Sequence, residues 1–245
     1  MLILGDIGNS DTKIFFVSSK KKILKRIVLS TKTITNRTLN KKLRSFLPKT
    51  KKILFCSVVP KKFSLIKKFL SKKTKIKCHE IKNLNLQSMI NIKVNLKQVG
   101  SDRIANAISL LNNRDNYIIL DFGTATTFDV LVNNTYIGGI IAPGVKLSLN
   151  TLSNKATLIP KVELKKINKV IGKNTISAVR SGFFWGYAGL IDNIIDLIKK
   201  ETRKSFKVIL TGGFSDLFKN SIKTKVIQNK DITIKGLIKI SKLIL

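Results

Sequence analysis

Two stretches of this chain repeat one local pattern, and the repetition limits the folds that the chain can adopt. The first, LILGDIGNSDTKIFFV at residues 2–17, is an apolar run that ends in an acid, then a glycine turn, then a second apolar run; YIILDFGTATTFDVLV at residues 117–132 has the same order. Placed over each other without gaps, the two stretches align Asp6 with Asp121, Gly8 with Gly123 and Thr12 with Thr127. A duplicated strand–turn–strand unit predicts two related α/β halves, which we expect to face each other across a cleft.

Both repeats continue in the same way along the chain. A third extended segment follows each pair, at residues 25–33 and 135–141, and segments of helical periodicity come next. Further strands are expected at residues 51–59 and 206–214, and helices at residues 36–49, 61–73, 101–113, 174–201 and 233–245, with a loop leading into a helix over 142–156. Within 174–201, the spacing suits close packing of a helix face that carries the small residues Ala178, Gly182, Gly186 and Gly189. The expected domains are therefore residues 1–112 and 113–245, each built around a mixed sheet.

The charge of the chain is strongly positive. Its 245 residues contain 47 Lys and Arg against 13 Asp and Glu, a formal net charge of +34, which attracts polyanions. The lysines are scattered among isoleucines and asparagines, however, and no aromatic residues alternate with them as a base-stacking surface requires. We therefore expect a lysine-rich solvated surface and no nucleic-acid binding beyond non-specific electrostatic attraction. A non-catalytic nucleic-acid-binding protein remains the alternative that this charge supports.

Targeting and cysteine usage indicate a cytoplasmic protein. No apolar run has the length needed to cross a bilayer, and the N-terminus lacks the basic segment of a signal peptide. Cys56 and Cys78 have no CxxC spacing, so both are expected to be reduced, structural thiols. The tripeptide of residues 78–80, Cys-His-Glu, is not expected to bind a metal, because its side chains cannot all turn inward.

The paired acids at the strand ends point to phosphate chemistry. Glycine lets a phosphate approach the backbone closely, and the Ser and Thr hydroxyls of both turns add donors. Asp6 and Asp121 would repel phosphate directly, but each can hold a cation such as Mg²⁺ that binds phosphate oxygens. Such turns favour a nucleoside triphosphate, although neither a GxxxxGK[ST] nor a GxGxxG sequence is present. The alternative is that both acids only cap their turns.

A second group of candidate residues is the sequence GSDR at residues 100–103. Asp102 is a candidate general base for a kinase, and Arg103 has the planar fork that binds a carboxylate or phosphate. An acid at a helix start is often only a cap, and spacing does not choose between the two interpretations.

With these residues assembled, the chain resembles the type III pantothenate kinases. The similarity spans nearly the whole chain and comprises, in order, DIGNSDTK at 6–13, SVVP at 57–60, GSDRIANA at 100–107, DFGTATTFD at 121–129, GGIIAPG at 138–144, TLSNKATLIP at 151–160, IGKNT at 171–175 and TGGF at 211–214. These enzymes belong to the superfamily of sugar kinases, Hsp70 chaperones and actin. The resemblance therefore implies two duplicated ribonuclease H-like halves, of the actin and Hsp70 type, around an ATP cleft.

The resemblance also implies a role for each matching position. ATP would be bound by Asp6, Ile7, Gly8, Asn9, Ser10, Asp11, Thr12, Lys13 and Thr124, with Asp6 near Mg²⁺. Asp121 would bind a monovalent cation, K⁺ or NH₄⁺. Pantothenate would be bound by Gly100, Ser101, Asp102, Arg103 and Thr175, with Asp102 as the base and Arg103 on the substrate carboxylate. The family forms homodimers, and Thr175 would act from the partner subunit.

The chain departs from the family pattern at two places. Val94 stands where family members carry an aromatic residue and a proline shortly before the G-x-D-R sequence, so one wall of the substrate pocket is expected to differ. A kinase of the same fold with a shifted substrate is a second alternative on this ground. The turn has Asn9 and Ser10 where Asn-Thr is usual, and since the hydroxyl is retained we expect little effect.

Overall fold

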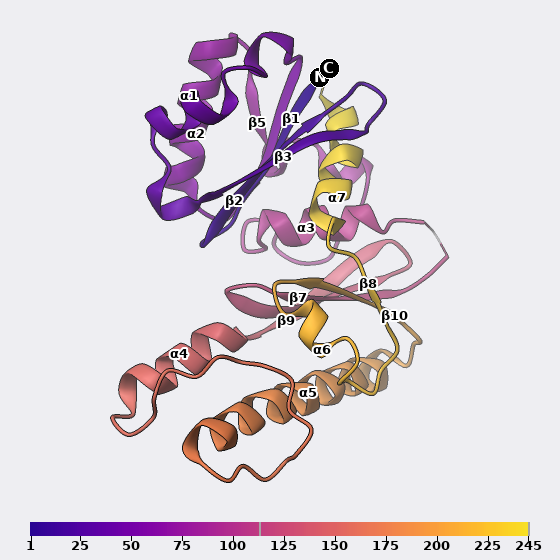
Figure 1. Cartoon of the computed structure of the whole chain (residues 1–245). Coiled ribbons are helices and arrows are strands. Elements are labelled where there is room, and N and C mark those ends of the chain that lie inside the picture. Colours follow the sequence, from indigo (N-terminus) through magenta and orange to yellow (C-terminus); the bar gives the residue numbers. More distant parts are fainter. Residues whose placement is uncertain (113, 245) are drawn as a thin grey trace. The chain divides into compact units, whose positions relative to one another are not determined.

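The computed structural model describes residues 1–112 and 114–244 and divides into two compact units (Figure 1). The first unit comprises residues 1–111 and 231–245, and the second comprises residues 112–230. Compactness therefore places the C-terminal segment with the first unit, whereas the sequence suggested that it belongs to the second half. That residues 1–112 and 113–245 form the two halves of an ATPase stays a prediction.

The first unit is built on a five-stranded mixed sheet in the order β3-β2-β1-β4-β5. Its strands are β1 (Leu2–Ile7), β2 (Asp11–Val17), β3 (Ile23–Ser30), β4 (Lys52–Ser57) and β5 (Cys78–Glu80). β1 pairs antiparallel with β2 and parallel with β4. The turn between β1 and β2 and the carboxyl end of β4 therefore both lie at the carboxyl end of β1. A two-residue strand, β6 (Asn91–Ile92), lies in the segment that leads to the next helix.

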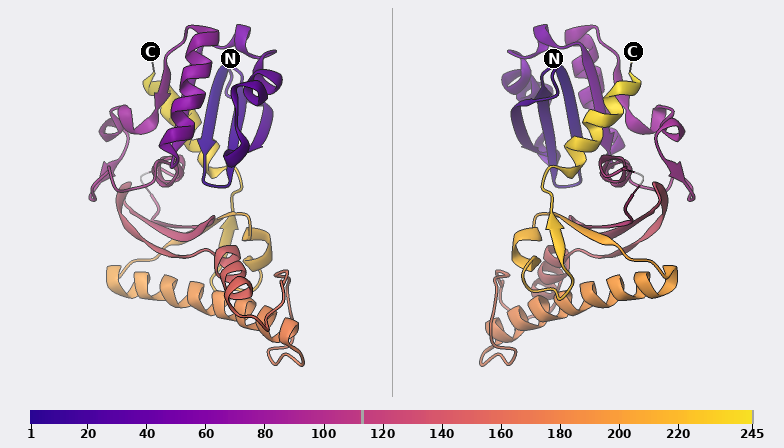
Figure 2. Two further views of the ribbon diagram at one scale, coloured as in Figure 1. Left: turned by 90° about the vertical axis from the view of Figure 1, so that its left-hand side faces the viewer. Right: turned by 90° about the vertical axis from the view of Figure 1, so that its right-hand side faces the viewer.

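Helices cover both faces of this sheet (Figures 1 and 2). They are α1 (Asn36–Leu43), α2 (Pro60–Thr74), α3 (Ser101–Ser109) and α7 (Ile232–Ile240). Side chains alternate along a strand, and Ile3 and Ile7 of β1 accordingly pack with Leu39 of α1 and Leu70 of α2. The opposite face meets α3 and α7, which also pack against each other. Asp6 lies on this second face, since it is adjacent in sequence to Ile7.

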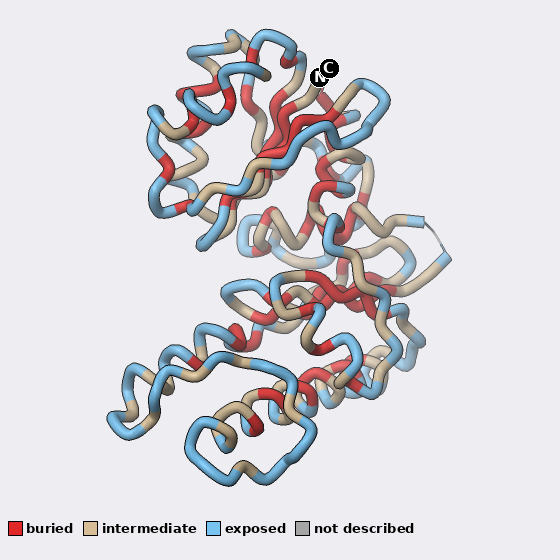
Figure 3. Tube along the Cα trace, viewed as in Figure 1, coloured by how far each residue is buried: buried red, intermediate tan, exposed pale blue. Residues whose placement is uncertain are grey.

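The second unit repeats this architecture. Its strands lie in the order β11-β10-β7-β8-β9. They are β7 (Tyr117–Phe122), β8 (Ala125–Val132), β9 (Thr135–Pro143), β10 (Lys207–Gly212) and β11 (Val226–Gln228), and the helices are α4 (Val145–Lys155), α5 (Thr175–Thr202) and α6 (Ser215–Phe218). The inward side chains of β7 and β8 form an apolar core with α5, which Figure 3 shows as buried stretches along these elements.

The two sheets have the same topology, which confirms the predicted duplication. In each, a central strand pairs antiparallel with the next strand and parallel with a later one: β1 with β2 and β4, and β7 with β8 and β10. The register corrects the gap-free alignment at one position. Asp6 pairs with Lys13 but Asp121 pairs with Thr127, so Thr127 is the counterpart of Lys13 and not of Thr12. The first turn is one residue longer, and a gap-free alignment misses that insertion.

Other expectations differ from the structure in detail. α1 ends at Leu43, before the expected end at residue 49, and the short elements α6 and β11 were not expected. The helix expected over 101–113 ends at residue 109, and its last expected residue lies outside the described ones, as does residue 245 of the closing helix. The glycine face of α5 is not closely packed within the chain, because a Cβ at Gly182, Gly186 or Gly189 would meet no atom within 4 Å. No described helix combines the length and apolarity of a membrane span.

Candidate active site

Asp6 is the buried acid at the carboxyl end of β1. Its Oδ2 lies 3.8 Å from the Nζ of Lys13, its register partner on β2, and the side chain is only 13% exposed. Burial raises the pKa of Asp6 to about 6; the Lys13 charge opposes this rise, and the negative charge of Asp102 adds to it. Asp6 faces the side of the sheet on which α3 packs, the helix that carries Asp102 in its first turn.

Cys56 is a neighbour of Asp6 that the sequence did not indicate. It pairs with Asp6 in the parallel register of β1 and β4, and its Sγ donates a hydrogen bond to Asp6 Oδ1 over 3.6 Å. Burial and the negative charge of Asp6 raise the pKa of the Cys56 thiol well above its usual range. The thiol thus keeps its proton and acts as a donor to the carboxylate.

The turn after Asp6 is fixed from the end of β3. Thr31 donates from its backbone N–H to Ser10 O over 2.8 Å and from its hydroxyl to Gly8 O over 2.8 Å. Because that hydroxyl proton is already committed, the buried Thr12 must donate to Thr31 across their 2.9 Å contact. Asn9 and Ser10 are left at the exposed tip of the turn. The side chains of Ile7 and Thr12 are buried, so any contact with a ligand at this turn must use their backbone.

Asp102 stands in the first turn of α3. Its Oδ1 accepts the backbone N–H of Arg103 over 2.9 Å, an interaction that lowers its pKa, but burial has the larger effect and the pKa is raised. Gly100 makes room for this carboxylate, because a Cβ there would come within 2.4 Å of Asp102 Oδ1. The glycine of the G-x-D-R sequence therefore has a local steric reason. The helix start also places Asp102 where backbone N–H groups and the helix dipole stabilise a negative charge.

Ser101 ties α3 to the end of β4. It is fully buried, its Oγ accepts the backbone N–H of Ser57 over 2.7 Å, and its hydroxyl donates to Ser57 O over 2.9 Å. Glu80, at the end of β5, accepts the backbone N–H of Lys82 over 2.7 Å, and burial raises its pKa. The sequence pointed to Ser57 only through the SVVP segment at 57–60 and to Glu80 only through the tripeptide of residues 78–80. It did not predict the bonds between Ser57 and Ser101, which join residues 44 positions apart.

Asp121 and Thr124 lie together in the second unit. Asp121 is half-buried at the end of β7 and pairs with Thr211 of β10. Gly212, with a φ of +86°, brings its backbone close to this carboxylate, since a Cβ there would lie 2.5 Å from Asp121 Oδ1. Thr124 is exposed in the turn between β7 and β8.

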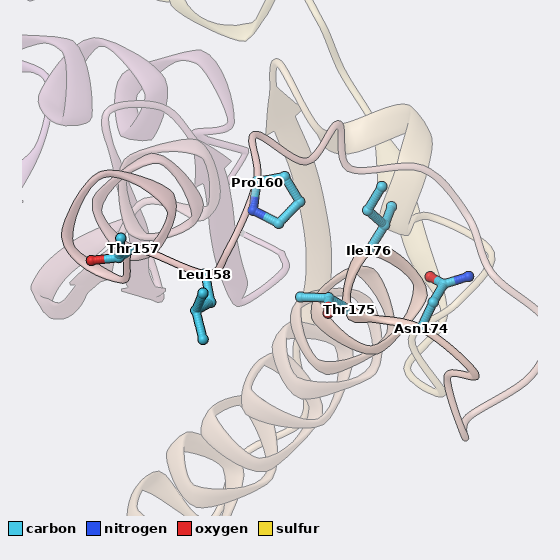
Figure 4. Close-up of a pocket in the computed structure, with 6 residues that line it drawn as sticks. All are labelled: Thr157, Leu158, Pro160, Asn174, Thr175 and Ile176. Carbon is cyan, nitrogen blue, oxygen red and sulfur yellow. The ribbon is translucent and has the colours of Figure 1, made fainter.

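Thr175 lies at the start of α5, beside an open depression of about 500 Å³ (Figure 4). The depression is lined by Thr157, Leu158, Pro160, Asn174, Thr175 and Ile176. Asn174 caps the helix by accepting the backbone N–H of Ser177 over 2.9 Å. Apolar side chains nearby in the sequence are strongly exposed, with Leu158 at 91% and Ile171 at 85%. This part of the second unit therefore presents apolar surface to its surroundings.

The donor chemistry of Asp6 fits a divalent cation that arrives with a nucleotide. Mg²⁺ usually takes one or two carboxylates from the protein and fills its octahedral shell with phosphate oxygens and water. Among the described residues, no three His, Cys, Asp or Glu side chains gather as a metal site of their own. One mostly buried carboxylate beside a lysine and a glycine turn fits such a ligand.

Comparison with known proteins gives one consistent result. The family model described as type III pantothenate kinase matches residues 2–197. A type III pantothenate kinase from Pelagibacter ubique is 68% identical over the full length of both chains, and one from Sulfurihydrogenibium is 35% identical over 97% of this chain and 98% of its own. Among solved structures, a ROK family glucokinase from Streptomyces griseus, in complex with glucose and AMPPNP, has a TM-score of 0.56 and 11% identity over 99% of this chain and 98% of its own. This last likeness concerns the fold alone.

Proposed function

Because the chain belongs to the type III pantothenate kinase family, we propose that it transfers the γ-phosphoryl group of ATP to pantothenate. The products are 4′-phosphopantothenate and ADP, and the reaction is the first step of coenzyme A biosynthesis. The observation that carries the proposal is the placement of two acids in one unit: Asp6 ends β1 on the sheet face that meets α3, Asp102 stands in the first turn of α3, and burial raises the pKa of both. We place the enzyme in the cytoplasm.

Asp102 acts as the general base. The primary hydroxyl oxygen of pantothenate forms a bond to the γ-phosphorus, the bond from that phosphorus to the β–γ bridging oxygen breaks, and ADP leaves with the electron pair. The hydroxyl proton passes to the Asp102 carboxylate. A primary alcohol is far too weak an acid to ionise beforehand, so the proton moves late, and the raised pKa of Asp102 makes the carboxylate a better acceptor.

The turn of residues 6–13 binds the ATP phosphates. Lys13 reaches phosphate oxygens, and Asp6 holds Mg²⁺, which when bound neutralises charge on the β- and γ-phosphates. Ile7 and Thr12 contribute backbone groups, whereas Gly8, Asn9, Ser10 and Asp11 form the turn itself. Thr124 contacts ATP from the second turn, and Asp121 binds K⁺ or NH₄⁺. The place of the half-buried Asp121 carboxylate at the end of β7 supports this last assignment.

Pantothenate is bound by the start of α3. Arg103 pairs its guanidinium with the substrate carboxylate, a contact for which the planar fork is suited. Gly100 and Ser101 contribute backbone groups, because the Ser101 hydroxyl is engaged with Ser57. Thr175 makes a further contact from the partner subunit of a homodimer. Leu158 and Ile171 are strongly exposed apolar side chains, and Leu158 lines the same depression as Thr175, which supports an apolar contact with a second subunit.

ADP release from ATP, measured with and without pantothenate in K⁺ and then in Na⁺ buffer, tests the proposal. We expect turnover that depends on pantothenate and is strong only in K⁺. The proposed function would be contradicted if folded protein bound ATP but showed no pantothenate-dependent ADP release in either salt. A panel of hydroxy acids run beside pantothenate shows whether Val94 has shifted the substrate.

A further inference from the structure

The two oxygens of the Asp6 carboxylate have different partners. Oδ1 accepts the thiol proton of Cys56 over 3.6 Å, whereas Oδ2 lies 3.8 Å from Lys13 Nζ. Cys56 is fully buried on the strand next to Asp6, so it cannot reach a ligand itself. Its contact fixes one oxygen from inside the protein. The other oxygen is left on the side of the lysine that we assign to the phosphates.

The second unit has a hydrogen-bond donor at the equivalent place. Asp6 pairs with Cys56 on the parallel neighbour strand, and Asp121 pairs with Thr211 on its own parallel neighbour in the same topology. Thr211 is also buried, with 5% exposure. Side chains paired across parallel strands point to the same face of a sheet. Each unit therefore places a thiol or hydroxyl beside its acid, although the two residues differ in type.

We propose that Cys56 is a positioning residue, which holds the Asp6 carboxylate in the orientation that binds Mg²⁺·ATP. This proposal rests on the proposed function, because it takes Asp6 as the residue near Mg²⁺. A carboxylate held by one hydrogen bond loses less rotational freedom when its other oxygen meets a ligand. Without the thiol, the side-chain partner that the described residues leave to the Asp6 carboxylate is Lys13, 3.8 Å away. The proposal predicts that Mg²⁺·ATP binding depends on the hydrogen-bond donor of residue 56 and not on the volume of its side chain.

Three variants separate the donor from the volume. Cys56→Ala removes the donor, and Cys56→Ser restores one. Cys78→Ala is the matched control: Cys78 is the other buried cysteine, it lies in the same sheet on β5, and it packs in the apolar core. The dissociation constant of ATP is measured by titration calorimetry, once with Mg²⁺ and once with EDTA. The same proteins are then assayed for kcat and KM.

We expect Cys56→Ala to weaken Mg²⁺·ATP binding about three- to tenfold, which is the range of one modest hydrogen bond. Binding of ATP in EDTA should be unchanged, Cys56→Ser should return to within about twofold of the wild type, and Cys78→Ala should match the wild type. The same loss in EDTA, a Ser variant no better than the Ala variant, or unchanged Mg²⁺·ATP binding by Cys56→Ala would overturn the proposal. A wild-type protein that does not bind Mg²⁺·ATP would instead overturn the proposed function, and this inference with it.

Discussion

Asp6 shows at the scale of one residue how a ligand site can oppose stability. The carboxylate is buried, its pKa is raised to about 6, and its nearest cation is 3.8 Å away. A buried carboxylate with incomplete partners costs free energy in the folded state. A cation bound there would supply the missing charge. Residues selected for binding often lower stability in this way.

The first prediction concerns this residue and pH. The folded protein keeps the Asp6 proton up to about pH 6, whereas the unfolded chain releases it near pH 4, so ionisation lowers the free energy of unfolding as the pH rises from about 4 to about 6. Asp6→Asn removes that titration. At pH 7 in EDTA the variant should be more stable than the wild type by about 2 to 3 kcal/mol, and the gain should shrink toward pH 4. Urea unfolding at several pH values measures it; a difference that does not vary with pH would contradict the explanation.

The second prediction concerns Asp102. Asp102→Asn keeps the shape of the side chain and its place at the start of α3 but cannot accept the substrate proton. Turnover should fall about 10²- to 10⁴-fold, the usual contribution of a general base, while ATP binding stays within about twofold. Steady-state kinetics and calorimetry measure the two effects. Wild-type rates from this variant would reduce Asp102 to a helix cap.

At the scale of elements, the two units support the same turn by different means. In the first unit, Thr31 at the end of β3 bonds Gly8 O with its hydroxyl. In the second, Gly144 follows β9, and its backbone approaches so closely that a Cβ would come within 2.0 Å of Thr124 O. The turn is therefore held by a side-chain hydrogen bond in the first unit and by close backbone packing in the second. The duplication preserved the topology and the acid, but not the contacts that hold the turn.

The third prediction concerns the packing of α7 on α3. A Cβ at Gly236 of α7 would come within 1.8 Å of Ala105 O, so Gly236→Ala must push the two helices apart. The variant should lose about 1–3 kcal/mol of unfolding free energy through overpacking. Gly182→Ala in α5 is the control, because its Cβ meets no atom and removing a helical glycine gains about 0.5–1 kcal/mol. Urea unfolding of both variants measures the difference, and equal effects would show that α7 does not need this contact.

At the scale of the whole molecule, the proposed homodimer sets the fourth prediction. Leu158 is 91% exposed and lines the depression together with Thr175, and Ile171, which precedes Thr175 in the same loop sequence, is 85% exposed. Replacing both by Asp should convert the dimer to a monomer, because two charges would enter an apolar contact. Light scattering after size exclusion gives the mass, and the monomer should also lose activity if Thr175 acts across the interface. A wild-type protein that is itself monomeric at assay concentration would refute the dimer.

The net charge is also a property of the whole molecule. With +34 from scattered Lys and Arg, the chain must attract any polyanion at low salt. Attraction of this kind falls steeply with ionic strength and carries no sequence preference. Charge of this sort gives no information about the fold or the reaction.

Local chemistry determined what the sequence by itself could predict. Alternating apolar positions indicate strands, glycine and hydroxyl residues indicate turns, and an acid at the end of each first strand marks the candidate site. These signals lie within a few residues of each other, so the repeat, the mixed α/β class and the candidate acids Asp6, Asp102 and Asp121 followed without coordinates. The substrate came from the resemblance, and no pattern of composition or spacing could name it.

The tertiary structure decided what depends on distant partners. Cys56 reaches Asp6 across 50 residues, Thr31 meets Thr12 across 19, and α7 joins the first unit from the far end of the chain. The one-residue difference between the two turns, which moves the counterpart of Lys13 to Thr127, is visible only in the strand register. A local pattern fixes how a segment folds, but the energy of a buried charge depends on whichever side chains the sheet and helices bring beside it.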